Sequence, residues 1–370
     1  TAMTRKSVHS PAGQTGQGHS NNSSSTPMSN EHILSELHHL YVDPTHGLLE
    51  IGRKLGLHLF APRRKVNIMM IGNHSSGKSS FINWYVGAKV QKTGVAIETQ
   101  GFTLVTAGKM RETLTGKATV RLYPYLKPLE SINGVLQYLS TELTPSSARQ
   151  FNLVNFIDTP GLADGKLHYP YDIERAILWL GDISDLIFVF FDPIGQALCK
   201  RTLNLVEKLN QLYPERIRFF LSKADEAGIE SDRQKVMMQI VQELCKRNGL
   251  NQCGFEMSTI YIPGHADLKV REQMCTNQIE ETCDEVAKTI ALTIQNTFNA
   301  IETDINQLEE LARSKLDSNK SSWRHNLHNG LKLFFILLLC IQFPLSILLY
   351  PNQTPHFSFN ANSLNYDSVD

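Results

Sequence analysis

A loop with the spacing Gly-x4-Gly-Lys-Ser directly follows a short, largely apolar run, and this pair constrains the fold most. The run is VNIMMIG (66–72), and the loop continues it as GNHSSGKS (72–79). A loop of this kind joins a buried strand to a helix, and its backbone N–H groups together with the helix N-terminus face an anion. The pattern therefore predicts a phosphate-binding α/β domain.

Short apolar runs alternate with helical patterns through the middle of the chain. Several of the runs are apolar throughout, as expected for strands covered on both faces. The alternation predicts a P-loop α/β fold, with a mostly parallel sheet and helices on both faces. The predicted strands are 66–72, 102–108, 118–123, 151–158, 185–192, 216–222 and 258–264, and the helical patterns include 79–87, 171–182, 199–213 and 232–249.

The flanks of this domain have a different character. Residues 1–30 are rich in Ser, Asn, Gly and Thr and almost devoid of large apolar side chains, so we predict disorder. A helical flank over 31–64 follows, capped by Ser29 or Asn30. The nucleotide-binding domain is predicted over 65–265.

A second helical flank is predicted over 266–325. Apolar residues recur there at three- and four-residue spacing from Ile279 to Leu308, which indicates one long amphipathic helix or two with a break. We expect it to pack on the N-terminal helices as a small helical subdomain. A dimerising coiled coil is the alternative.

The run LKLFFILLLCIQFPLSILLY (331–350) is long enough to cross a bilayer, at about 30 Å as a helix. Lys320, Arg324 and Lys332 precede it, and the tail 351–370 has no Lys or Arg. A transmembrane segment here would leave the nucleotide-binding domain in the cytosol. A truncated or misread terminus is the alternative interpretation.

Composition limits the partners. Lys plus Arg and Asp plus Glu number 36 each, so the net charge is zero and no global basic field favours nucleic acid. Any membrane or partner contact must be local. None of the six cysteines forms a CxxC pair, so neither a zinc site nor a disulfide framework is expected.

The loop after the first strand supplies the predicted phosphate site. Glycines let its backbone wrap the phosphates, Lys78 would reach the β- and γ-phosphates, and the Ser79 hydroxyl would bind Mg²⁺. The residues assigned to nucleotide binding here are Gly72, Ser76, Gly77, Lys78, Ser79 and Ser80.

Two later motifs complete a nucleotide site. DTPG (158–161) places Asp158 to hold Mg²⁺ through water and the Gly161 N–H to sense the γ-phosphate. In LSKADE, Lys223 would pack along the base while Asp225 accepts from a guanine edge. Each motif follows a predicted strand, and ligands bind at the carboxyl ends of strands in such sheets.

The residues that would catalyse hydrolysis are less conventional. Thr99 is our choice for the switch threonine and third metal-site residue, with Thr93 as the alternative. Leu162 follows DTPG at the position where Ras-like enzymes carry a water-orienting glutamine, and leucine cannot perform that role. His74 and Ser75, inside the loop, are the candidate replacements.

These motifs in this order resemble the dynamin-type G domain. The segments GNHSSGKSSFIN, TGVAIETQGF, FIDTPGL, LIFVFFD and LSKADE carry the resemblance, over about residues 31–300. It is strongest for the branch with the EH-domain-containing ATPases and sarcalumenin. The resemblance implies that Ser75 is the catalytic P-loop serine, that Thr99 is the switch threonine, and that His74 stands where dynamins have glutamine.

The resemblance also implies an activity. Members of this superfamily oligomerise on membranes and couple hydrolysis to remodelling, which implies a homodimer or oligomer formed through the G domain or the helical flank. We therefore expect a Mg²⁺-dependent, slow, assembly-stimulated GTPase at a membrane. The EH-domain-containing branch uses ATP with a similar Lys-Ala-Asp motif, so an ATPase is one alternative, and a non-hydrolysing nucleotide-dependent scaffold is another. Kinship with sarcalumenin leaves a luminal G domain open.

Overall fold

The computed structural model describes residues 29–93, 101–164, 169–194, 198–251, 256–263 and 275–349, with side chains up to residue 342. The predicted disordered segment lies outside these residues except for Ser29 and Asn30. The chain divides into two compact units. One comprises Thr1–Asp43 and Phe60–Asn299, and the other comprises Pro44–Leu59 and Ala300–Asp370.

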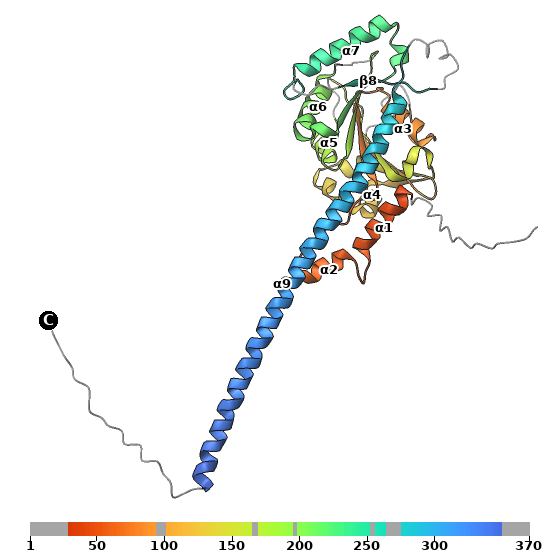
Figure 1. Cartoon of the computed structure of the whole chain (residues 1–370). Helices are drawn as coiled ribbons and strands as arrows, with labels where there is room; N and C mark the ends of the chain where they lie inside the picture. Colours follow the sequence, from red (N-terminus) through yellow and green to blue (C-terminus); the bar gives the residue numbers. More distant parts are fainter. Residues whose placement is uncertain are drawn as a thin grey trace, which may run out of the picture. The chain divides into compact units, whose positions relative to one another are not determined.

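An eight-stranded sheet forms the centre of the first unit (Figure 1). Its order is β3-β4-β2-β5-β1-β6-β7-β8. Strands β5, β1, β6, β7 and β8 run parallel, while β2 is antiparallel to β5 and β3 is antiparallel to β4. The strands are β1 (Val66–Gly72), β2 (Phe102–Ala107), β3 (Glu112–Thr115), β4 (Leu139–Thr144), β5 (Val154–Asp158), β6 (Leu186–Phe191), β7 (Ile217–Leu221) and β8 (Met257–Thr259). The predicted mostly parallel α/β fold is confirmed.

Helices connect these strands. The α-helices of the first unit are α1 (Asn30–Val42), α3 (Lys78–Val86), α4 (Gly116–Leu122), α5 (Ile173–Asp182), α6 (Lys200–Leu212) and α7 (Glu230–Cys245). Short 3₁₀ turns are η1 (Pro124–Ser131), η2 (Val135–Tyr138), η3 (Ala148–Leu153), η4 (Pro214–Arg216) and η5 (Ala224–Glu226). The Ser29 hydroxyl accepts a hydrogen bond from the His32 N–H and so caps α1, as one of the two predicted alternatives.

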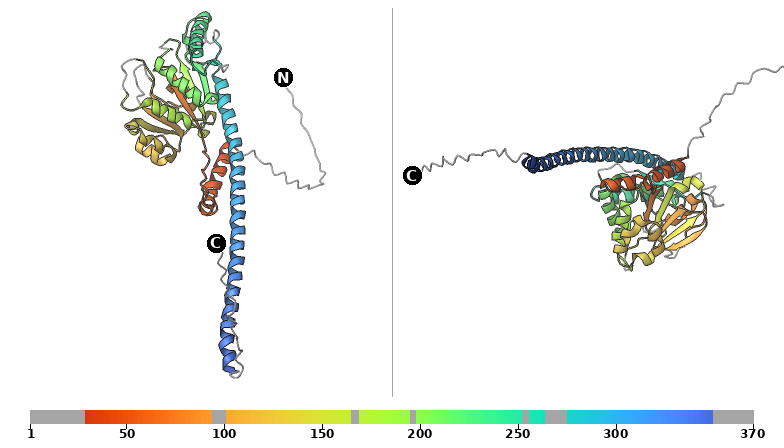
Figure 2. Two further views of the ribbon diagram at one scale, coloured as in Figure 1. Left: turned by 90° about the vertical axis from the view of Figure 1, so that its left-hand side faces the viewer. Right: turned by 90° about the horizontal axis from the view of Figure 1, so that it is seen from below.

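Side chains of the central strands alternate between two cores. In β1, Met69 and Ile71 pack with α5 and α6, whereas Ile68 and Met70 pack with α3, α1 and the first turns of α9 (Ile279–Leu349). Figure 2 shows the beginning of α9 and the α5–α6 pair on opposite sides of the sheet. A strand with helices on both faces buries every side chain, which explains why β1 and β6 are buried along their whole length.

One predicted strand is wrong. Residues 118–122 lie in α4 and Tyr123 follows its end, because Gly116, Thr119 and Val120 share one buried helical face at spacings of three and four. Two strands were not predicted. β3 is exposed at the sheet edge, and the only apolar residues of β4 are Leu139 and Leu143, so neither forms an apolar run.

The second unit is helical. It contains α2 (Leu48–Leu55), which ends at Gly56 with a φ of 82°, and the part of α9 from Ala300 onward. The Lys315 ammonium donates to the carbonyl of Lys54, at the end of α2. The long predicted helix is present as the single helix α9, whereas the domain boundaries and the dimerising coiled coil remain predictions.

The predicted transmembrane segment is not supported. In the part of the chain that the structure describes, no helix is long and apolar enough to cross a membrane. The side chains of 343–350 lie outside the described residues.

Candidate nucleotide-binding site

Three sequence motifs meet at one edge of the sheet. Parallel pairing of β1 with β5 and β6, and of β6 with β7, brings the carboxyl ends of these strands together. The phosphate loop follows β1, the DTPG segment follows β5, and the Lys-x-Asp motif follows β7. This is the edge at which open α/β sheets bind ligands.

The glycines of the phosphate loop are required by its backbone. A Cβ on Gly72 would lie 2.5 Å from the carbonyl oxygen of Phe190 and 2.6 Å from Ser76 Oγ. Gly77 has a φ of 86° immediately before α3, a conformation that L side chains adopt at a cost. The predicted roles of both glycines therefore fit the loop geometry.

Lys78 lies inside the loop rather than in solvent. It is 6% exposed, and its ammonium donates to the carbonyls of Gly72 (3.1 Å) and Asn73 (2.9 Å) and to Ser76 Oγ (3.4 Å). Burial lowers the pKa of Lys78 to about 8, although the charge of Asp158 acts in the opposite direction. A phosphate at this loop would supply the anion that the ammonium lacks.

Ser79 and Asp158 form the predicted metal pair. The Ser79 hydroxyl donates to Asp158 Oδ2 at 2.6 Å. Asp158 is fully buried, and within the described residues its Oδ1 has no hydrogen-bond partner. Burial raises the pKa of Asp158, while Lys78 and the hydrogen bond from Ser79 oppose that shift. An orphaned carboxylate oxygen beside a hydroxyl fits a hard cation such as Mg²⁺.

A metal here would need further ligands. In the described ranges, no group of three or more His, Cys, Asp or Glu side chains is placed to hold a metal. Mg²⁺ ordinarily takes one or two protein ligands, substrate phosphates and several waters. The chemistry of the Ser79–Asp158 pair therefore fits a metal that is held jointly with a nucleotide.

The DTPG segment is joined to the phosphate loop through the backbone. The Leu162 N–H donates to the carbonyl of Gly72 at 3.1 Å, and the His74 N–H donates to the carbonyl of Leu162 at 3.0 Å. A Cβ on Gly161 would lie 2.7 Å from His74 Cα, so glycine permits this close approach. Two backbone hydrogen bonds therefore fix the DTPG segment against the phosphate loop.

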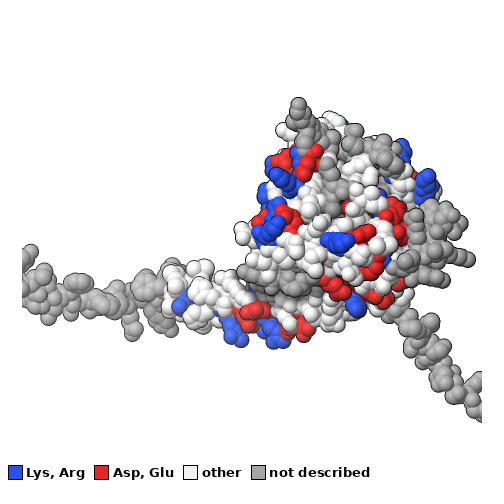
Figure 3. Space-filling view, turned by 90° about the horizontal axis from the view of Figure 1, so that it is seen from above, with Lys and Arg blue, Asp and Glu red and all other residues white. Residues whose placement is uncertain are grey.

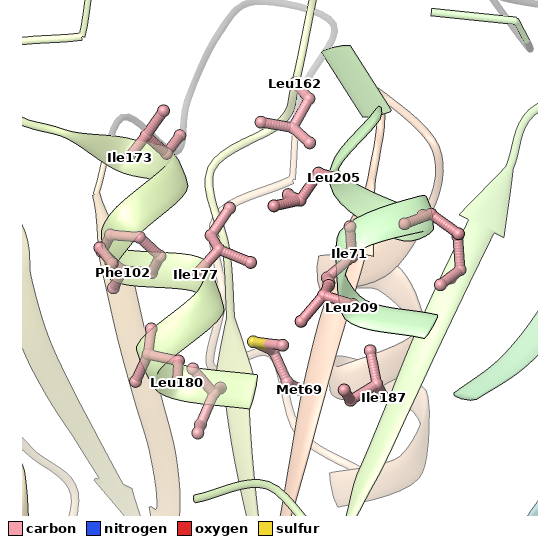
Figure 4. Close-up of a cluster of buried hydrophobic side chains, with 14 of the residues drawn as sticks. Met69, Ile71, Phe102, Leu162, Ile173, Ile177, Leu180, Ile187, Leu205 and Leu209 are labelled. Carbon is pink, nitrogen blue, oxygen red and sulfur yellow. The ribbon is translucent and has the colours of Figure 1, made fainter. Parts of the chain in front are cut away.

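Leu162 belongs to the hydrophobic core. It is 1% exposed and lies between Ile173 and Ile177 of α5 and Leu205 of α6 (Figure 4). A buried leucine cannot hydrogen bond to an attacking water. Any hydrolysis must therefore use other groups.

His74 and Ser75 lie at the accessible side of the loop. Ser75 is exposed and has a φ of 59°, and its hydroxyl lies 2.9 Å from His74 Nδ1. These two polar side chains are thus paired with each other. Ser76 is fully buried and Ser80 is half-buried on α3.

The Lys-x-Asp motif has a partner that the sequence did not indicate. Lys223 has a φ of 51°, and its ammonium donates to Asp192 Oδ2 at 2.9 Å. Asp192 is buried and directly follows β6. Asp225 is half-buried in η5, which starts with a hydrogen bond from the Ala224 N–H to the carbonyl of Ile260. The acidic residue that ends FFD was the only sequence signal for Asp192.

The predicted switch threonine cannot be placed. Thr99 lies outside the described residues, and Thr93, the alternative, is exposed at the end of a described range. On the face that Figure 3 shows, acidic and basic side chains are interspersed. Lys78, which is buried in the loop, offers positive charge to a phosphate there.

A strand, a glycine-rich loop and a helix, with metal-site and base-site motifs on neighbouring parallel strands, define a P-loop nucleotide-binding protein. Residues 68–244 match the Dynamin family. Over these residues the chain is similar to a dynamin-type G domain, and it is also similar to the EH domain-containing proteins.

Individual relatives are distant. EH domain-containing protein 1 of Arabidopsis thaliana is 24% identical over 221 residues, which is 56% of this chain and 38% of that protein. Human EH domain-containing protein 2 is 26% identical over 170 residues, 44% of this chain and 30% of that protein. The matched part thus spans about a third of each relative's length. Among solved structures, an oligomerised bacterial dynamin pair matches with a TM-score of 0.47 and 15% identity, covering 86% of this chain and 51% of that chain.

Proposed function

We propose that this protein binds a nucleoside triphosphate together with Mg²⁺ and hydrolyses it. One observation carries the proposal: the buried Lys78 ammonium and the orphaned Asp158 oxygen lie on adjoining phosphate-site loops. The ammonium would hold the β- and γ-phosphates, and Ser79 and Asp158 would hold the metal. Bound Mg²⁺ would neutralise charge that develops on the phosphate oxygens.

We assign catalysis to Ser75 and His74. Leu162 is buried in the core, whereas the Ser75 hydroxyl and the His74 ring lie on the loop that would surround the terminal phosphates. Thr99 completes the proposal as the third metal-site residue. With no glutamine at position 162 we expect slow turnover.

GTP is the proposed substrate, with ATP as the alternative. Asp225 can accept two hydrogen bonds from the guanine edge. The Asp192 carboxylate accepts from the Lys223 ammonium and so fixes the lysine of the same motif. The similarity to EH domain-containing proteins supports the ATP alternative, since that branch uses ATP with a similar Lys-Ala-Asp motif.

Base preference can be tested by calorimetric titration of the full chain with GTPγS and ATPγS in Mg²⁺. We expect GTPγS to bind more tightly. Asp225→Asn should weaken GTPγS binding by about 10- to 100-fold, because it loses hydrogen bonds to a charged group. It should leave ATPγS binding nearly unchanged. Glu226→Gln, at the exposed neighbouring position, is the matched control. Tighter binding of ATPγS by the unmodified chain would reverse the substrate assignment.

We further propose that the protein acts at a membrane surface as an oligomer. Large apolar side chains over 333–341 of α9 are 39–65% exposed, which supports a contact with lipid or with a second copy. Acceleration of hydrolysis by anionic liposomes would support this proposal. A cytosolic location stays a prediction.

A further inference from the structure

The first turn of α6 contacts the phosphate loop. Thr202, which is fully buried, donates its hydroxyl hydrogen to Asn73 Oδ1 at 2.5 Å. The backbone carbonyl of Asn73 accepts from the Lys78 ammonium. Helix α6 therefore holds Asn73, and Asn73 in turn contacts Lys78.

The same turn also contacts the DTPG segment. Asp164 lies three residues after Gly161, and its carboxylate accepts from the N–H groups of Lys200 (2.8 Å) and Arg201 (3.0 Å). The thiol of Cys199 donates to it as well, at 3.1 Å. Cys199 is at the cap position of α6 and makes no capping hydrogen bond with its own side chain. Asp164, which lies 36 positions before Lys200 in the sequence, thus accepts from backbone N–H groups that the start of a helix leaves unpaired.

A second connection joins α6 to Gly161. The Arg201 guanidinium carbon lies 5.5 Å from the centroid of the Tyr169 ring, and the Tyr169 hydroxyl donates to the carbonyl of Gly161 at 2.7 Å. At the other end of the segment, the Thr159 hydroxyl donates to the carbonyl of Met70 in β1. The segment is therefore held from β1 on one side and from α6 on the other.

We propose that Asp164 is a positioning residue for nucleotide recognition: by capping α6 it fixes the segment that carries Gly161 against the phosphate loop and so sets the preference for triphosphate over diphosphate. The inference rests on the proposed function. Only a triphosphate offers an oxygen to the Gly161 N–H. If the segment is released from α6, binding the γ-phosphate must also order that segment, and this entropy cost falls on the triphosphate alone.

The readout is the ratio of the dissociation constants for GDP and GTPγS, measured on the full chain with Mg²⁺. Asp164→Ala should lower this ratio by about two- to thirtyfold, the range expected from losing one helix cap. Asp172→Ala is the matched control, since Asp172 caps α5 by accepting from the Arg175 N–H at 3.0 Å. Both variants should lower the melting temperature to a similar extent, but the control should keep the ratio.

Asp164→Asn separates capping from a general loss of stability. Asparagine keeps one acceptor oxygen where the carboxylate uses both, one for the Lys200 N–H and one for the Arg201 N–H, so this variant should give a ratio between those of the unmodified chain and Asp164→Ala. An unchanged ratio in Asp164→Ala, or an equal fall in Asp172→Ala, overturns the inference and leaves nucleotide binding intact. If the unmodified chain binds neither nucleotide, the proposed function and this inference both fail.

Discussion

The charge state of Lys78 links the geometry of the phosphate loop to a pH dependence. Its pKa is lowered from 10.5 to about 8, so the unfolded chain binds more protons than the folded one between these values. The nucleotide-free protein therefore gains stability from this group as pH rises from about 8 to 10.5. Phosphate binding, in contrast, needs the protonated Lys78 ammonium, which is lost as pH rises.

Affinity for GTPγS should consequently fall as pH rises above about 8. Binding must take up one proton per site there, which gives a slope of up to about tenfold per pH unit. Titrations at pH 7, 8 and 9 measure it. In Lys78→Arg the guanidinium stays charged, so the slope should disappear although binding is weaker. A wild-type affinity that stays constant from pH 7 to 9 would show that Lys78 does not meet the phosphates.

At the scale of residues, short local motifs predicted much of the site. Gly72, Lys78 and Ser79 belong to one loop, and Asp158 and Asp225 each follow a strand. The residues that support them were not predicted. Asp192 and Thr202 reach their partners from elements distant in sequence, and Asp164, although close to DTPG, contacts the start of α6; only the fold brings these groups together.

At the scale of elements, sequence periodicity predicted buried strands well and exposed ones poorly. β1 and β6 are apolar runs because both of their faces are covered. β3 has no such signal, and the sequence of α4 resembles a strand because a helix of about two turns holds too few apolar residues to establish a period.

The beginning of α9 is an element whose role in packing can be tested directly. Ile290 is fully buried in the core with α3 and the sheet, whereas Leu292, on the same helix, is 61% exposed. Ile290→Ala should lower the free energy of unfolding by about 2–5 kcal/mol.

Leu292→Ala is the control for that substitution and should change the free energy of unfolding by less than about 0.5 kcal/mol. Chemical denaturation followed by circular dichroism gives both values. Equal effects of the two substitutions would mean that α9 does not pack on the G domain as described.

At the scale of the whole molecule, the fold class and the family followed from the order of the motifs. The sequence also suggested a membrane-spanning end, but among the described residues no helix is long and apolar enough to cross a membrane. The curated relatives are matched over about a third of their length, so the activity of the whole protein rests on the proposal.

The most direct test is single-turnover phosphate release from GTP bound to the full chain in Mg²⁺, with and without anionic liposomes. We predict slow release that liposomes accelerate, a loss of release in Lys78→Ala, and a reduction of about 100-fold or more in Ser75→Ala. Lys89→Ala, at an exposed position outside the loop, should behave as the unmodified chain. Tight binding of GTP without phosphate release, even on liposomes, would contradict the enzyme assignment and leave a nucleotide-dependent scaffold.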